Sequence, residues 1–206
     1  MSIDIWNILS LVGTVAFASS GAIVAIEEEF DILGLFILGF VTAFGGGAIR
    51  NVLIGLPIET LWSQGIAFYA AAAAILFIMI FPNLLSGKGR DAEVVSDAIG
   101  LAAFSVQGAL YATQSHQPLS AVIVAAVLTG AGGGIVRDVL AGRKPGVLRI
   151  RSEIYAGWSI LVGIILYFKI AKTTTDYYLL VLVVTSLRML GYKKQWHLPV
   201  VRPRKK

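Results

Sequence analysis

The stretch TAFGGGAIRNVLIG, Thr42 to Gly55, places three consecutive glycines and an arginine inside a long apolar run. Glycine is unfavourable in a helix interior, and arginine is costly in hydrocarbon. A second stretch, TGAGGGIVRDVLAG, begins 87 positions later at Thr129 and repeats the glycines, the arginine, Val, Leu and the final Gly. The same shift aligns FASSGAIVA (17–25) with FSVQGALYA (104–112) without a gap. The chain therefore contains two copies of one unit.

The composition indicates a membrane protein, since 57% of the residues are hydrophobic and only 14% are charged. Runs of about 20 apolar residues are long enough to cross a hydrocarbon core. Such long runs differ from the alternating strands of barrels, so the fold class is all-α integral membrane. We expect seven transmembrane helices, at about 5–26, 32–55, 62–82, 94–113, 119–142, 154–171 and 175–191.

The repeat predicts how these spans are organised. Each copy holds three spans, an odd number, so the second copy enters the membrane in the opposite direction, as in many transport proteins. We expect a first three-helix repeat at 1–86, an inverted second repeat at 87–171, a seventh helix at 172–191 and a basic cytoplasmic tail at 192–206.

Basic residues predict the orientation, with the N-terminus outside and the C-terminus inside. The outer side then holds only Lys169 and Lys172. The basic tail favours contact with anionic membrane lipids, and we expect no nucleic-acid partner. The inner side collects Lys88, Arg90, Arg143, Lys144, Arg149, Arg151, Lys193, Lys194, Arg202, Arg204, Lys205 and Lys206.

The two glycine triplets predict backbone breaks within the second and fifth spans. Freed backbone groups in a membrane need protein or a water-filled cavity around them, so carbonyls near Thr42 and Thr129 could face a cation. The alternative is that the glycines only let two helices cross closely. The predicted kinks are at Gly45, Gly46, Gly47, Gly132, Gly133 and Gly134.

Arg50 lies in the second span and Arg137 in the fifth, and both arginines are expected to face inward unless they extend to the nearest headgroups. The next residue differs between the copies, Asn51 in the first and Asp138 in the second. Asp138 could pair with an arginine, contact a monovalent cation, or do both. Further candidate pore residues are Ser19, Ser20, Thr42, Gln107 and Thr129, although membrane Ser and Thr often bond their own backbone.

Other acidic residues have simpler explanations. Asp97 is expected near a helix N-terminus, where a carboxylate is favourable. The loop EEEFD, Glu27 to Asp31, is expected to be a solvated acidic loop, or to attract cations if it lies beside an entrance.

Enzyme activity is not expected. GAGGGIVRD has no G-K-[ST], and Ile135 stands where the last glycine of G-x-G-x-x-G would be. The two histidines, His116 and His197, lie in a loop and in the tail, and the absence of cysteine excludes a thiolate metal site. We expect no cofactor.

The doubled motif G-G-G-x-x-R-[ND]-V-L resembles that of the trimeric intracellular cation (TRIC) channel family and its prokaryotic relatives, some of which are described as glycine transporters. The resemblance implies a homotrimer with a pore in each protomer, gated at glycine kinks of the second and fifth helices and permeable to K⁺ or Na⁺. It also implies a multi-pass protein of a prokaryotic plasma membrane. Asn51 stands where many copies of this motif have Asp.

The residues leave two functions open. The first is a monovalent cation channel in which carbonyls and Asp138 favour the cation. The second is an alternating-access transporter of glycine or another small zwitterion, in which an arginine holds the carboxylate and Asp138 holds the ammonium group.

Overall fold

The computed structural model describes residues 5–57, 59–62, 64–85, 89–148 and 155–196, and these residues form helices and connecting loops. The long helices are α1 (Ile5–Glu27), α2 (Ile32–Ile54), α4 (Gly65–Ile80), α5 (Gly89–Gln114), α6 (Leu119–Leu140), α7 (Tyr155–Tyr167) and α8 (Thr174–Lys194). A one-turn helix, α3 (Glu59–Trp62), and two short 3₁₀ turns (Pro82–Leu85 and Gly146–Leu148) complete the described part.

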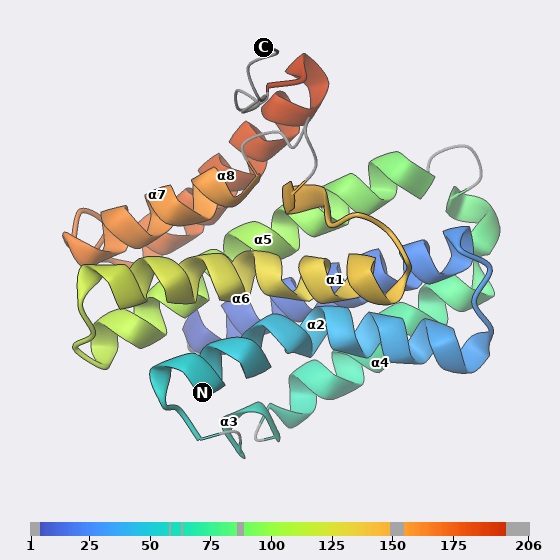
Figure 1. The fold of residues 1–206 in the computed structure, drawn as a ribbon, viewed down its shortest axis with the longest axis horizontal. Coiled ribbons are helices and arrows are strands. Elements are labelled where there is room, and N and C mark those ends of the chain that lie inside the picture. The colour runs from blue at the N-terminus through green and yellow to red at the C-terminus, as the bar shows by residue number, and fades with distance from the viewer. Residues whose placement is uncertain (1–4, 58, 63, 86–88, 149–154, 197–206) are drawn as a thin grey trace, which may run out of the picture.

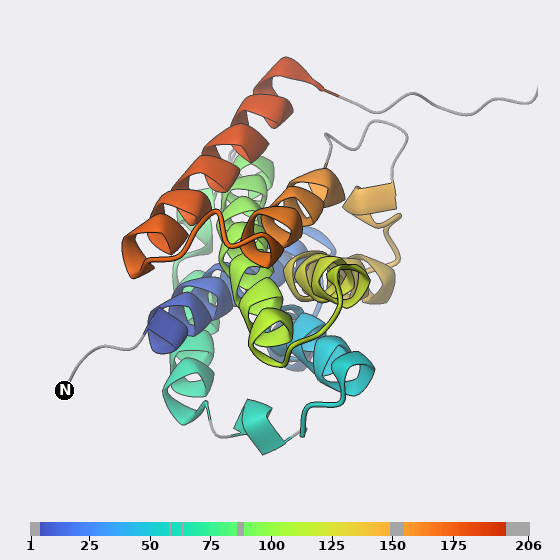
Figure 2. The same cartoon turned by 90° about the vertical axis from the view of Figure 1, so that its left-hand side faces the viewer.

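Four helices form the centre of the molecule. α1 packs against α2 and α5, and α6 also packs against α2 and α5, so that the four make a closed bundle. α4 lies against α1, α7 lies against α6 and α5, and α8 covers α5 (Figures 1 and 2). In Figure 1, α2 and α6 run in opposite directions along the long axis, as do α1 and α5.

Local sequence signals set the helix ends. The side chain of Asp31 caps α2 by accepting a hydrogen bond of 2.7 Å from the backbone N–H of Gly34. α2 ends at Gly55, whose left-handed conformation (φ 72°) is one that glycine adopts without strain. α8 begins with a capping box between Thr173 and Asp176. These caps separate the apolar runs into distinct helices.

The distribution of side chains is that of a membrane protein. α1, α2, α5 and α6 are each long and apolar enough to cross a membrane, while α4 is apolar but shorter. Large apolar side chains cover much of the outside, including Val52, 75% exposed, and Ile66, 77% exposed. Arginine, aspartate and asparagine side chains are buried inside. The described helices therefore form a multi-pass membrane bundle, as the sequence predicts.

The helix count differs from the expected seven. The described residues form eight α-helices, because the loop before α4 folds into the extra turn α3. For the same reason the helix formed by the third apolar run, α4, begins at Gly65 and not at position 62. The tail residues 197–206, with Lys88, Arg149 and Arg151, lie outside the described residues, so the predictions of orientation and of a basic tail rest in part on residues beyond this description.

Candidate functional site

The two glycine triplets meet where α2 crosses α6. A side-chain carbon added at Gly46 would lie 2.6 Å from the carbonyl oxygen of Thr129, and one at Gly132 would lie 3.1 Å from the Cα of Gly46. A carbon added at Gly133 would collide with the carbonyl oxygen of Thr42. Small residues let membrane helices approach closely, and here they bring two backbones into contact. The crossing leaves no room for another side chain at these positions.

Both helices remain α-helical through the triplets, from Ile32 to Ile54 and from Leu119 to Leu140. The carbonyls of Thr42 and Thr129 face the glycines of the other helix. The hydroxyl group of each of these threonines donates a hydrogen bond of 2.6 Å to a backbone carbonyl of its own helix. Kinks at the triplets, and a gating role for them, stay predictions.

Equivalent contacts surround this crossing in the two copies. Gly13 packs against the ring of Phe104, and Gly100 packs against the ring of Phe17. The two rings meet edge to face with their centroids 5.3 Å apart. Each residue of these pairs lies 87 positions from its counterpart, so the sequence repeat extends to the packing of the core.

Arg137 is the centre of a buried charge cluster at one end of the crossing. It is only 3% exposed, and its Nε and Nη2 donate to Oδ1 of Asp138 over 2.9 and 2.7 Å. Its Nη1 donates to the hydroxyl of Ser20 at 2.5 Å and to Asp97 at 3.1 Å. Glu93 lies 3.3 Å from Nη2. Three carboxylates therefore surround one buried guanidinium.

A second arginine extends this cluster to the end of the bundle. Arg143, in the loop after α6, pairs at 2.8 Å with Glu27, the last residue of α1, and at 2.5 Å with Glu28, which follows it. It also lies 3.6 Å from Glu93 on α5. Burial lowers the pKa of Arg143, but the hydrogen bonds to the two glutamates outweigh it, so the pKa lies above its ordinary value. Arg143 thus links three elements as a permanent cation.

Arg50 occupies the equivalent place in the first copy, with different partners. Its Nε and Nη2 donate to Oδ1 of Asn51 over 3.0 and 2.7 Å, and its Cζ lies 4.3 Å from the centroid of the Tyr111 ring. Asn51 in turn donates to the hydroxyl of Thr60 at 2.7 Å and to the carbonyl of Pro57 at 3.2 Å. Arg50 is 2% exposed, and its Nη1 has no hydrogen-bond partner among the described residues.

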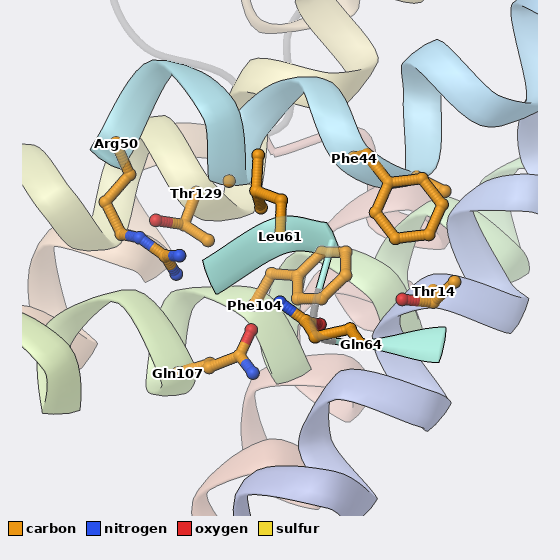
Figure 3. A pocket seen from close by; sticks show the side chains of 10 residues that line it. Thr14, Phe44, Arg50, Leu61, Gln64, Phe104, Gln107 and Thr129 are labelled. Atoms are coloured by element: carbon orange, nitrogen blue, oxygen red, sulfur yellow. The ribbon is translucent and has the colours of Figure 1, made fainter. Parts of the chain in front are cut away.

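Arg50 faces a small cavity lined by residues of α1, α2, α3, α5 and α6 (Figure 3). Its volume is about 10 Å³, which is about the room that one water molecule needs. The side-chain amides of Gln107 and Gln64 and the hydroxyl of Thr14 also face this space. The Thr14 hydroxyl, like Nη1 of Arg50, has no partner among the described residues. None of the described residues that line the cavity carries a carboxylate.

The structure brings together most of the residues predicted for the site. Arg137, Asp138 and Ser20 are in direct contact, while Arg50 contacts Asn51 and shares its cavity with other predicted residues. Ser19 is half-buried and lies outside these contacts. The predicted residues in the Arg50 cavity are Gly47, Gln107 and Thr129.

The prediction that Asp97 lies near a helix N-terminus is wrong. α5 begins at Gly89, more than one turn earlier than the expected start at 94, so Asp97 lies inside the helix and binds Arg137. The acidic loop is only partly solvated, because Glu27 and Glu28 hold Arg143.

Sequence reasoning missed several residues of the site. No motif marks Glu93, yet it contacts both Arg137 and Arg143. Thr14 lines the Arg50 cavity and the ring of Tyr111 packs against Arg50, and neither residue belongs to the doubled G-G-G-x-x-R motif. The repeat offers a signal for Asp97 and Glu93. Both lie on α5, the helix that aligns with α1, and the aligned pair Ser20 on α1 and Gln107 on α5 already marks the inward faces of these two helices.

Comparison with protein families gives a match over most of the chain. Residues 7–83 and 94–172 match the model of a family described as "Glycine transporter". The chain is 55% identical over 194 residues to the UPF0126 membrane protein YvgT of Bacillus subtilis, covering 94% of this chain and 95% of that protein. It is 36% identical over 202 residues to the inner membrane protein YadS of Escherichia coli, covering 92% of each.

Solved structures give a match of the same extent. The crystal structure of a prokaryotic TRIC channel superimposes with a TM-score of 0.86 and 30% identity, covering 94% of this chain and 98% of that one. A TRIC trimeric intracellular cation channel orthologue from Rhodobacter sphaeroides superimposes with a TM-score of 0.82 and 28% identity, covering 92% and 97%.

Proposed function

Because this chain belongs to the prokaryotic branch of the TRIC channel family, to which the description glycine transporter is also attached, we propose that it is a monovalent cation channel. Each protomer of a homotrimer would hold one pore, in the plasma membrane of a prokaryote. The permeant ion would be K⁺, with Na⁺ as the alternative, and no cofactor or enzymatic step is required. The similarity to solved channels over nearly the whole of both chains carries this proposal.

The architecture proposed is two inverted three-helix repeats, α1–α2–α4 and α5–α6–α7, followed by α8. The opposite directions of α2 and α6 in Figure 1 and the equivalent contacts of Phe17 and Phe104 support it. With the N-terminus outside, the Arg137 cluster lies toward the inner side and Arg50 toward the outer side. The pore would pass the crossing of α2 and α6, with these polar groups above and below it.

The state described here is proposed to be closed. Backbone contact at Gly46 and Gly133 fills the crossing, and the cavity beside it holds about 10 Å³. Opening would require α2 and α6 to separate or bend at the triplets. Asp138 would then be released in part from Arg137 and become a contact for the cation.

A second candidate, transport of glycine or another small zwitterion by alternating access, is favoured by the description of the family and by the Arg50 site. Nη1 of Arg50, which has no partner among the described residues, offers a donor for a carboxylate, and charge-assisted hydrogen bonds of this kind are strong. A carrier would need the cavity beside it, now about 10 Å³, to widen before the substrate could enter.

Reconstitution into lipid bilayers separates the two. A channel gives unitary currents in a KCl gradient, with a reversal potential near the K⁺ equilibrium value and no dependence on glycine. A carrier gives saturable accumulation of radiolabelled glycine in vesicles and no unitary currents. Absence of cation current from protein that is folded and correctly inserted would overturn the channel proposal.

A further inference from the structure

The charges around the two buried arginines differ systematically between the copies. Arg137 is surrounded by Glu93, Asp97 and Asp138. The residues 87 positions earlier in the sequence are Trp6, Ser10 and Asn51, and all three are neutral. Every carboxylate of the Arg137 cluster is thus replaced by a neutral residue at the corresponding position of the first copy.

Arg50 is nevertheless just as buried as Arg137. A buried guanidinium without an opposite charge is costly, because removing an ion from water costs several kcal/mol. The face of Tyr111 and the oxygen of Asn51 compensate this cost in part. They leave the formal charge unneutralised, and they leave Nη1 without a partner among the described residues.

The cavity beside Arg50 provides the place for an external counter-ion. Arg50 and Thr14 both line this space, and Nη1 of the one and the hydroxyl of the other are buried groups without a partner among the described residues. The amide of Gln107 faces the same space in Figure 3. Its volume of about 10 Å³ leaves room for one small ligand and is too small for a whole amino acid.

We propose that this cavity binds a small inorganic monovalent anion, with chloride as the natural ligand, which serves as the counter-ion of Arg50. The anion takes the place that carboxylates hold around Arg137. This site is independent of whether the protein conducts cations or carries glycine, since it concerns binding in the resting protein.

The first test is thermal unfolding of the purified full-length protein at constant potassium, with chloride exchanged stepwise for gluconate. A ligand that binds only the folded state stabilises it in proportion to the logarithm of its concentration above Kd. We expect chloride to raise the Tm of the wild type by a few degrees. Asn51→Asp supplies an internal counter-ion and Arg50→Gln removes the cation, so both variants should lose the chloride dependence.

The comparison uses the dependence on chloride and not the absolute Tm, because Asn51→Asp also loses the hydrogen bond to Pro57. Arg90→Gln, at an exposed arginine in the first turn of α5, should keep the full chloride effect. An equal chloride effect in all four proteins would show a general salt effect and overturn the proposal.

Crystals of the wild type grown in bromide give a second readout that does not depend on any variant. We expect an anomalous peak within hydrogen-bond distance of Nη1 of Arg50. A water at that place, with no anomalous signal and no specific chloride effect, would overturn the proposal. Stabilisation by glycine at constant chloride, without stabilisation by chloride itself, would also overturn it and would favour the carrier function.

Discussion

The guanidinium of Arg137 and the carboxylate of Asp138, neighbours along α6, are joined by two hydrogen bonds that end on the same oxygen, Oδ1. The other oxygen, Oδ2, accepts a hydrogen bond of 2.7 Å from the backbone N–H of Gly146 in the loop that follows. Asp138 thus neutralises a buried charge and holds a loop at the same time.

Asp138→Asn should therefore destabilise the protein. The amide keeps one acceptor but loses the negative charge, and Asp97 and Glu93 remain to balance Arg137 in part. We expect a loss of about 1–3 kcal/mol, measured as a fall in Tm in detergent. Asp31→Asn is the matched control, since it removes an exposed carboxylate while asparagine still caps α2. Equal Tm values for the two variants would contradict the assignment.

Long apolar runs and the repeated glycines predict the fold class and the principal helices, because both depend on composition and spacing along the chain. The partners of the arginines follow from how helices rotate against one another, which spacing alone does not define. Asp97 illustrates this. Its apolar run places it near a helix N-terminus, but α5 begins earlier than that run, so Asp97 lies inside the helix and binds Arg137. Tyr111 lies under Arg50 through packing between α5 and α2, and its counterpart in the repeat, Val24, gives no hint of it.

Adjacent glycines of the first triplet should respond in opposite ways to alanine. Gly46→Ala places a methyl group 2.6 Å from the backbone oxygen of Thr129, so α2 and α6 must move apart. We expect a loss of at least about 1–3 kcal/mol. At Gly45 the nearest atom is a methyl of Val41 at 3.8 Å, so Gly45→Ala should be neutral or stabilise the helix by up to about 1 kcal/mol.

The same pair of variants also tests gating. If α2 bends at the triplet when the pore opens, Gly45→Ala should lower the open probability in bilayer recordings while Tm is kept or raised. Unchanged gating in a stable Gly45→Ala protein would argue against a bend at this position. Gly46→Ala serves as the packing control, for which we expect loss of stability and of current together.

Arg143 is expected to stabilise the closed state by holding the loop after α6 against the end of α1 (a latch). It ties the loop after α6 to Glu27 and Glu28 at the end of α1, and these pairs are partly exposed. Exposed ion pairs contribute about 0–1 kcal/mol each, so Arg143→Gln should fold normally. We expect a higher open probability in this variant, measured by single-channel recording. Arg90→Gln is the control for loss of one positive charge, and an identical effect of both variants would exclude a specific latch.

Arg50→Gln should separate the channel from the carrier. A fixed positive charge beside a cation path raises the barrier by electrostatic repulsion, which is strong where water is excluded. In chloride-free gluconate, where Arg50 has no external counter-ion, we expect this variant to conduct K⁺ severalfold better than the wild type. A carrier would instead lose the donor for its carboxylate, and glycine uptake would fall by about tenfold or more. Arg50→Lys retains the charge without the fork geometry, so it should leave K⁺ conductance near the wild-type value but depress glycine uptake. Loss of both activities in protein with a normal Tm would contradict the placement of Arg50 beside a cation path.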